Sequence, residues 1–340
     1  MKSRKLIVNL LAALITGVAV ASPVAAEKLL RIQTLFTPSD RNFQHMRACL
    51  NEVADRSGGK VRFDLLPVGA TVGPTGTMEA VGLGVLDGHF TYSPLWTGIE
   101  PAFPLLSDLT GGHEDAESLH DFFYNHGGLN LLRRAYDRFG VYVAGVLPTG
   151  IESLPSRRPV RTVADLKGMK IRVPAGITAT VFQRLGAAPV TMPMSEAYGA
   201  LEKGVVDAAD IGPLWWNHDL GVHQFAKYEL QPSMHSNIAL DLSFNKKTWA
   251  ALPAEVRTDI ESSMRPCGDR WMKAMRAADV EVEPKVKAAG VTLTSWSPDE
   301  REKFRSVART VWTEFGARSP LAKEALDAQM RYLAAKGVLK

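Results

Sequence analysis

Two charged side chains, Arg172 and Asp210, each come at the end of a strand that the sequence predicts in the middle of the chain. In parallel α/β sheets, ligands gather outside the carboxyl ends of the strands. An arginine there can grip a carboxylate through two parallel charge-assisted hydrogen bonds, because its guanidinium is a planar fork. The residues alone leave a second interpretation open, in which Arg172 is an ordinary surface arginine on an edge strand.

These positions depend on an alternation of strands and helices. Strands are expected at 29–34, 61–66, 88–92, 169–173, 189–192 and 205–210, with helices between them at 42–56, 74–84, 178–185 and 195–203. Such alternation predicts an α/β fold with a mostly parallel sheet. Residues 204–207 repeat the pattern of residues 84–87, which suggests two similar lobes. Helices are expected at 253–264, 269–288, 298–315 and 320–335. No Pro-, Gly- or Ser-rich linker separates the lobes, so the chain should cross between them more than once.

The first 26 residues have the layout of a secretory signal peptide. Lys2, Arg4 and Lys5 precede an apolar run at 6–20, and small residues at 24–26 offer a cleavage site. The run is too short for a comfortable membrane span, and no later segment is long and apolar enough for one. We therefore expect an exported, periplasmic protein; the alternative is a buried N-terminal helix.

The charge and the cysteines set further limits. Three of the 40 basic residues and none of the 36 acidic residues lie in the expected leader, so the mature chain is close to neutral and no nucleic-acid partner is expected. The length of 340 residues suggests two domains. Cys49 and Cys267 can form a disulfide in an oxidising compartment or stay as two buried thiols. Sequence does not give the distance that decides between these.

Catalytic motifs are missing from the sequence. It has no GxSxG elbow, no HExxH, no P-loop and no Cys/His nucleophile arrangement. Gly82-Leu83-Gly84 begins like a dinucleotide-binding loop, but it ends a helix and its third glycine is misplaced. We therefore expect a binding protein and not an enzyme.

Three stretches together resemble the solute-binding proteins of TRAP transporters: Asp165–Pro174, Ala187–Asp207 and Asn245–Pro253. The spacing is coherent from about residue 61 to residue 264. The resemblance implies a two-lobed periplasmic binding protein of the Venus-flytrap kind, with crossing hinge strands and long C-terminal helices. It also implies that Arg172 clamps the carboxylate of the ligand.

The resemblance gives a division of the chain into lobes. Residues 1–26 are the signal peptide, 27–148 and about 236–268 form lobe I, 149–235 and about 290–315 form lobe II, about 269–288 is a long connecting helix, and 316–340 is a C-terminal helical segment.

Within the family, the closer likeness is to binders of 2-oxo acids and related small organic acids. In that branch the ligand often sits beside a metal ion held by a Gln, a Glu-Trp pair and a later Glu. Here Glu152 takes the place of the Gln, Asp210-Ile211 that of the Glu-Trp pair, and His235 that of the later Glu. This chain therefore departs from the pattern at each metal ligand.

Two readings of Glu152, Asp210 and His235 stay open. Two carboxylates and an imidazole can bind a divalent ion, and the imidazole favours a transition metal or zinc over calcium. Without a metal, the acids would accept hydrogen bonds from hydroxyls or an amine of the ligand, and His235 would donate one. No cofactor is certain from the sequence; a divalent metal ion or Na+ beside the ligand is the candidate.

Two aromatic residues complete the candidate site. Tyr92 follows a strand of the first lobe and can close the pocket from the other side. Trp215 can offer its ring to the ligand, although a core position is the usual one for tryptophan.

The resemblance implies a carrier that closes on a small organic acid and delivers it to the membrane subunits of a TRAP transporter. The long helix at 269–288 is a candidate surface for a homodimer. Two alternatives are a ligand-sensing partner of a membrane receptor kinase and a metal-dependent periplasmic enzyme built on Glu152, Asp210 and His235.

Overall fold

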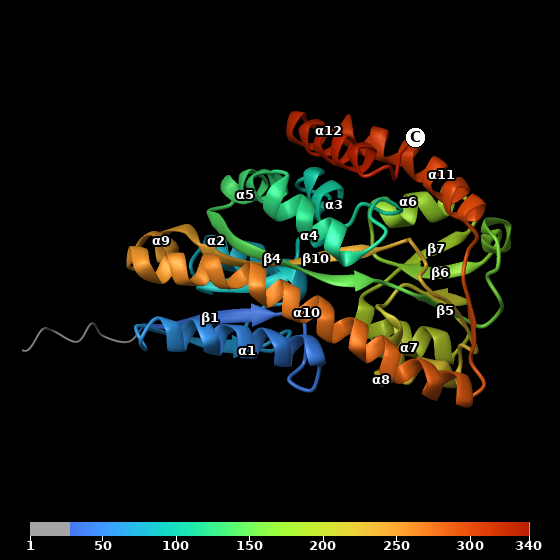
Figure 1. The fold of residues 1–340 in the computed structure, drawn as a ribbon, viewed down its shortest axis with the longest axis horizontal. Coiled ribbons are helices and arrows are strands. Elements are labelled where there is room, and N and C mark those ends of the chain that lie inside the picture. The colour runs from blue at the N-terminus through green and yellow to red at the C-terminus, as the bar shows by residue number, and fades with distance from the viewer. Residues whose placement is uncertain (1–27, 340) are drawn as a thin grey trace, which may run out of the picture.

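The structure is a computed structural model that describes residues 28–339. The expected signal peptide, residues 1–26, lies outside the described residues. Between residues 28 and 339, no helix is long and apolar enough to cross a membrane. The described chain forms two sheets flanked by helices, one sheet in each of two lobes (Figure 1).

The first sheet has five strands in the order β2-β1-β3-β10-β4. β1 pairs in parallel with β2 and β3, whereas β10 runs antiparallel between β3 and β4. The mostly parallel sheet that the sequence predicts is therefore mixed here. The strands are β1 (Lys28–Thr34), β2 (Val61–Leu66), β3 (Gly88–Tyr92), β4 (Val141–Ile151) and β10 (Asn237–Asn245).

The second sheet has six strands in the order β11-β9-β5-β8-β6-β7. The strand expected at 205–210 is reduced to two residues, because only these pair with β5 and β6. The strands are β5 (Leu154–Ser156), β6 (Lys170–Val173), β7 (Ala188–Thr191), β8 (Ala208–Ala209), β9 (Tyr228–Leu230) and β11 (Thr292–Thr294).

The chain passes between the two sheets three times, at two short segments and once along α10 (Ala254–Ala288), which leads from β10 to β11. Residues 152–153 join β4 to β5, and residues 231–236 join β9 to β10. The multiple crossing that the missing linker predicts is thus present. Both segments also carry candidate site residues.

Twelve helices of the described chain flank the two sheets. Short 3-10 helices add single turns at 74–76, 93–96, 163–166 and 222–224. The helices are α1 (Arg41–Arg56), α2 (Thr77–Gly82), α3 (Ala102–Ser107), α4 (Ala116–Asn125), α5 (Gly128–Asp137), α6 (Ile177–Arg184), α7 (Met194–Glu202), α8 (Leu214–Asp219), α9 (Lys246–Ala250), α10 (Ala254–Ala288), α11 (Pro298–Gly316) and α12 (Pro320–Ala335).

α10 is a single helix of 35 residues that runs across the front of the molecule from the first lobe to the second (Figure 1). The sequence suggested two helices, at 253–264 and 269–288, and Pro266 lies in the gap between them. Proline in a helix removes one backbone hydrogen bond. Packing against β4, α1 and α8 keeps the helix continuous across this position.

A disulfide joins Cys49 in α1 to Cys267 in α10, with 6.0 Å between the two Cα atoms. Of the two states that the sequence left open, the structure has the bonded one. The bond fixes α1 against the middle of the helix that crosses both lobes.

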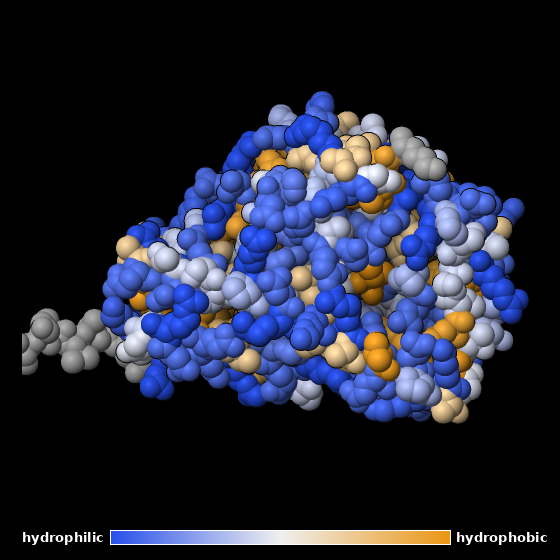
Figure 2. Space-filling view, viewed as in Figure 1, coloured by the Kyte–Doolittle hydropathy of each residue, from blue (hydrophilic) through white to orange (hydrophobic). Residues whose placement is uncertain are grey.

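The face of the molecule shown in Figure 2 has no large apolar patch. That side is mostly hydrophilic, and apolar side chains appear in small, separate groups. The large apolar side chains lie instead in buried clusters beside the two sheets.

Candidate functional site

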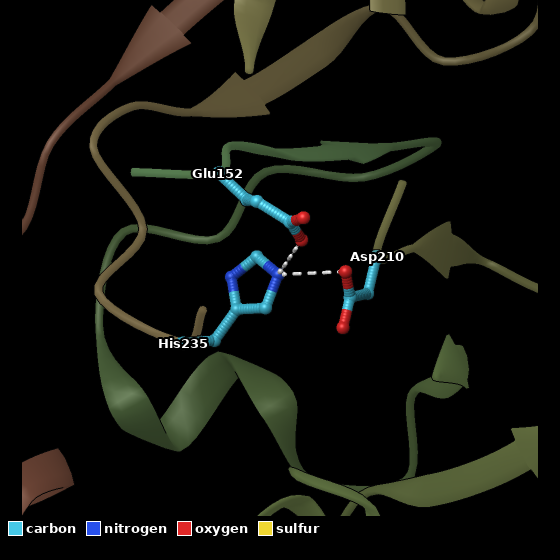
Figure 3. A group of neighbouring side chains, drawn as sticks. All are labelled: Glu152, Asp210 and His235. Carbon is cyan, nitrogen blue, oxygen red and sulfur yellow. Dashed lines mark ion pairs between the residues drawn. The ribbon is translucent and has the colours of Figure 1, made fainter. Parts of the chain in front are cut away.

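Three charged side chains from different parts of the chain meet between the lobes (Figure 3). Glu152 comes from the first crossing segment, Asp210 follows β8, and His235 comes from the second crossing segment. Their exposed fractions are 4%, 3% and 1%. Nε2 of His235 lies 3.3 Å from Oδ1 of Asp210 and 3.7 Å from Oε2 of Glu152. We call these three residues the acid–histidine cluster.

Backbone hydrogen bonds between the crossing segments hold the cluster together. The N–H of Glu152 donates to the carbonyl of Ser236 at 3.0 Å, and the N–H of Ser233 donates to the carbonyl of Glu152 at 3.2 Å. Met234, just before His235, has a left-handed φ of 61°, which is uncommon for a residue with a side chain. Its carbonyl accepts from the N–H of Gly111 at 3.0 Å. Backbone held in this region often marks a functional segment.

The Ser233 hydroxyl sets the orientation of the proton on His235. Its Oγ donates to the carbonyl of Glu152 at 2.8 Å and also contacts Nδ1 of His235. A hydroxyl has only one hydrogen, so both contacts are hydrogen bonds only if Nδ1 of His235 carries a proton and donates it to Oγ. Nε2, the other ring nitrogen of His235, then faces the two carboxylates.

The cluster groups shift one another's pKa strongly. Burial raises the pKa of Glu152 well above its usual range, and the charge of Asp210 raises it further. Burial also disfavours ionised Asp210, but the charges of His235 and, to a smaller extent, Arg172 hold its pKa below the usual value. The His235 imidazole is buried too, yet Asp210 and Glu152 raise its pKa to about 10. The cluster alone is therefore close to neutral, with a proton on Glu152, an ionised Asp210 and a charged His235.

Arg172 in β6 is 6% exposed, so the surface-arginine interpretation is wrong. Its Nε and Nη2 donate to the carbonyl of Met192 at 3.1 and 3.0 Å, and its Nη1 donates to the carbonyl of Asp210. Over residues 28–339, the side-chain hydrogen bonds of Arg172 all go to backbone carbonyls and none to a carboxylate. Three of its five N–H groups are therefore used on neutral carbonyls, and two remain for an anion.

Asp108 is a site residue that sequence reasoning missed. It follows α3, is 2% exposed, and accepts from the hydroxyl of Tyr92 at 2.5 Å and from that of Ser236 at 3.0 Å. Burial raises the pKa of Asp108 to about 6, and the nearby charges of Asp210 and His235 act on it in opposite directions. No local sequence motif marks Asp108 as a site residue, because its hydrogen-bond partners lie far from it in the sequence.

Tyr92 therefore reaches the site through Asp108. Burial raises the pKa of Tyr92 well above its usual value, and the carboxylates of Asp108, Asp210 and Glu152 add to the effect. The first lobe thus faces the acid–histidine cluster with a hydroxyl and a carboxyl group.

Trp215, which we expected to line the cleft, lies in a core between helices. Its ring stacks on Trp216 at 5.9 Å, and the guanidinium of Arg41 lies 5.5 Å from its centre. The backbone N–H of Trp215 donates to Oδ1 of Asp279 in α10 at 2.8 Å. The contacts described for this residue therefore run to α1 and α10, and we assign it to packing.

A buried network supports the backbone beneath the cluster. Glu229 of β9 is fully buried and pairs with His223. It also accepts from Nδ2 of Asn217 at 2.8 Å and from the hydroxyl of Ser153. Because Ser153 directly follows the glutamate of the cluster, this network fixes where that glutamate enters the site.

The two lobes are in contact around the site. The hydroxyls of Thr110 and Thr178 lie 2.8 Å apart, and Nε of Arg41 pairs with Asp219 at 2.8 Å. A groove of about 490 Å³ runs between the lobes near the carboxyl end of β6. Its lining includes Thr97 and Gly98 of the first lobe and Ala175, Gly176, Gln183 and Thr191 of the second.

Three comparisons relate the chain to known proteins. Residues 34–319 match the family described as DctP, bacterial extracellular solute-binding protein, family 7. The chain is 24% identical over 300 residues to the monocarboxylate 2-oxoacid-binding periplasmic protein of Nostoc sp., which covers 87% of this chain and 82% of the relative.

Two solved structures share the fold. One is a TRAP periplasmic solute-binding protein from Rhodobacter sphaeroides in an apo open form, with 34% identity and a TM-score of 0.78 over 91% of this chain and 98% of that one. The other is a TRAP transporter solute-binding protein from Bordetella bronchiseptica, with 23% identity and a TM-score of 0.83 over 92% of this chain and 93% of that one. It is a mixed-occupancy dimer with copurified calcium and picolinate in one active site.

Proposed function

The chain belongs to family 7 of the bacterial extracellular solute-binding proteins, and from that premise we propose that Arg172 binds the carboxylate of a small organic acid between the closed lobes. The protein is a periplasmic TRAP solute-binding protein of the two-lobed α/β fold, as the sequence predicted. Proteins of this kind bind small carboxylates in a cleft and pass them to TRAP membrane subunits. The expected assignment to this family is confirmed.

One observation carries the proposal for the site. The guanidinium of Arg172 is buried, and in the described chain its hydrogen-bond partners are two neutral carbonyl oxygens. A buried charge that no carboxylate contacts directly is unfavourable in general. An incoming carboxylate would give the guanidinium a direct partner in addition to the nearby charge of Asp210. Two remaining N–H groups on one planar fork suit the two oxygens of a carboxylate.

The other proposed contacts come from both lobes. Glu152, Asp210 and His235 would face the remainder of the acid, and Tyr92 with Asp108 would close it in from the first lobe. The Nostoc relative is named as a 2-oxoacid binder, which favours a 2-oxo or 2-hydroxy acid. The dimeric Bordetella structure is in keeping with the homodimer that we expected.

The rival functions receive no support from the family. Members of family 7 are solute-binding proteins and not enzymes, and neither a receptor-kinase partner nor a metal-dependent enzyme is indicated by the relatives. We propose that this chain likewise releases its ligand unchanged.

A thermal-shift screen of organic acids tests the proposal. The set should contain 2-oxo, 2-hydroxy and 2-amino acids, dicarboxylates and uncharged amides of the same acids. We expect the melting temperature to rise with at least one free acid and not with its amide. Equal shifts with acid and amide would contradict carboxylate capture by Arg172, and consumption of the bound acid would contradict a pure carrier.

A further inference from the structure

In the acid–histidine cluster, Oε2 of Glu152, Oδ2 of Asp210 and Nε2 of His235 make no hydrogen bond within the described residues. Nε2 of His235 has only ion-pair contacts with the two carboxylates, at 3.3 and 3.7 Å. All three side chains are more than nine-tenths buried. A buried polar atom without a hydrogen bond is unfavourable by about 1–3 kcal/mol. Three such atoms gathered around one point favour a bound ion or ligand group there.

We propose that the cluster binds a divalent transition-type cation, such as zinc or cobalt, in place of the calcium found with a ligand in the Bordetella relative. The inference rests on the proposed function, because the cation would lie beside the acid held by Arg172. It differs from that function in naming a metal class that the relative does not share.

The spacing of the cluster suits such an ion. One donor atom from each residue lies within 4.8 Å of the others. The two measured separations from Nε2 of His235 are 3.3 and 3.7 Å. Two donors of a tetrahedral ion with bonds of about 2.1 Å are about 3.4 Å apart. A small ion thus fits between the three side chains with little movement.

The donor types decide the metal class. Calcium takes six to eight oxygen ligands as a rule, and it gains little from an imidazole. Zinc, cobalt and nickel bind imidazole nitrogen well alongside carboxylates. His235 is therefore the residue that turns an oxygen site for a hard cation into a mixed site for a softer one.

Ser233 prepares the histidine for this role. A metal-binding histidine usually donates its other ring N–H to an oxygen, which fixes the tautomer and the ring orientation. Nδ1 of His235 makes this kind of bond to the hydroxyl of Ser233, whose own hydrogen goes to the carbonyl of Glu152. Nε2 then faces the two carboxylates, as Figure 3 shows.

Charge balance agrees with the assignment. A divalent ion would displace the proton of Glu152 and the proton on Nε2 of His235. The two carboxylates would then neutralise the ion, so that the charge of Arg172 remains for the acid. The competing occupant is a hydroxyl or amine of the ligand itself, which would satisfy the same atoms without a metal.

Direct metal titration of the purified protein tests the inference. The chain is freed of metal with a chelator and titrated by calorimetry with Zn2+, Co2+ and Ca2+ in the absence of any acid. We expect one zinc per chain, calcium binding at least 100-fold weaker, and the visible absorption of protein-bound cobalt. Equal affinities for calcium and zinc, or no metal binding, would overturn the inference.

Two variants sharpen the result. His235→Glu restores an all-oxygen set, so zinc should bind at least tenfold more weakly and calcium more tightly than in wild type. His126→Gln changes an exposed histidine outside the cluster and should leave zinc binding unchanged. Undiminished zinc binding by a folded His235→Glu protein would show that zinc binds elsewhere. If that variant does not fold, the zinc–calcium comparison and the cobalt spectrum of the wild type decide.

The two proposals fail separately. If the protein binds an acid fully after chelation but binds no metal, the metal inference is wrong and the proposed acid binding stands. If it binds zinc at one site but binds no acid, the proposed acid binding is wrong and the metal inference stands.

Discussion

Replacing Arg172 with glutamine removes the group that we propose binds the ligand carboxylate. Of the five N–H groups of a guanidinium, three donate to the carbonyls of Met192 and Asp210, which leaves two for the ligand. A hydrogen bond to a charged group contributes roughly 1.5–3 kcal/mol. Loss of both therefore weakens binding by about 3–6 kcal/mol, or roughly 10²- to 10⁴-fold in Kd.

Calorimetric titration with the acid found in the screen measures this change. Arg172→Lys keeps the charge but loses the planar fork, so its Kd should fall between those of wild type and Arg172→Gln. Arg184→Ala removes an exposed arginine that pairs with Glu314 at 2.8 Å and should bind as wild type does. An Arg172→Gln protein that melts at the wild-type temperature and binds within threefold of the wild-type Kd would refute the reasoning.

Three further predictions concern stability. Asp108→Ala should lower the free energy of unfolding in urea by about 2–4 kcal/mol, because Tyr92 and other buried donors lose their acceptor. Burial raises the pKa of Asp279 to about 6, so the folded state holds this proton more tightly than the unfolded chain. The Asp279 contribution to stability should therefore fall by up to about 3 kcal/mol as pH rises from about 4 through 6, and Asp279→Asn should lose that part of the pH dependence. Reducing the Cys49–Cys267 disulfide, whose cysteines are 218 residues apart, should lower the free energy of unfolding by up to about 5 kcal/mol.

Each of these has a matched comparison. Asp108→Asn keeps an acceptor at the same place and should be less destabilised than Asp108→Ala; equal losses would argue against the hydrogen-bond account. The Asp279 prediction is a difference between wild type and variant at pH 4.5 and 7, and parallel pH profiles would contradict it. For the disulfide, a Cys49→Ser/Cys267→Ser protein should not respond to reductant, and wild type should lose stability when reductant is added.

Elements with their own end signals were predictable from the sequence. α12 begins and ends at the expected residues, and α11 differs by one residue at its end. Ser297 and Ser319 accept hydrogen bonds from the first turns of these helices, and proline follows each of them. α1 is similar, since its apolar residues recur at helical spacing and Gly58 follows its end.

Elements decided by distant contacts were not predictable. The sequence predicted separate helices at 253–264 and 269–288, but α10 continues through Pro266 because both of its halves are buried against other elements. The strand expected at 205–210 keeps only the residues that find neighbours. A helix was expected at 195–203, yet α7 begins at Met194, after Pro193, with no side-chain cap.

Some residues of the site were likewise predictable from the sequence, and one was not. Position at a strand end suggested Arg172 and Asp210, and the family resemblance supplied Glu152 and His235. Neither the strand-end position nor the family resemblance indicated Asp108, because its role depends on hydroxyl partners 16 and 128 residues away. Such a residue is found only once the fold brings its partners together.

The arrangement of the site explains how binding can close the lobes. Glu152 and His235 lie on the two short segments that join the sheets, while Arg172 belongs to the second lobe and Asp108 to the first. A ligand shifts an open–closed equilibrium only by the contacts that are stronger in the closed state. Moving that equilibrium from 1:99 to 99:1 takes about 5.5 kcal/mol, and the two free N–H groups of Arg172 account for about 3–6 kcal/mol.

If the open form holds the acid through Arg172 alone, the contribution of Arg172 is the same in the open and closed forms and does not favour closure. Closure must then be driven by Asp108, Tyr92 and the acid–histidine cluster. Variants of the first-lobe residues should therefore weaken closure more than initial capture, which scattering measurements with saturating acid would separate from the effect of Arg172→Gln.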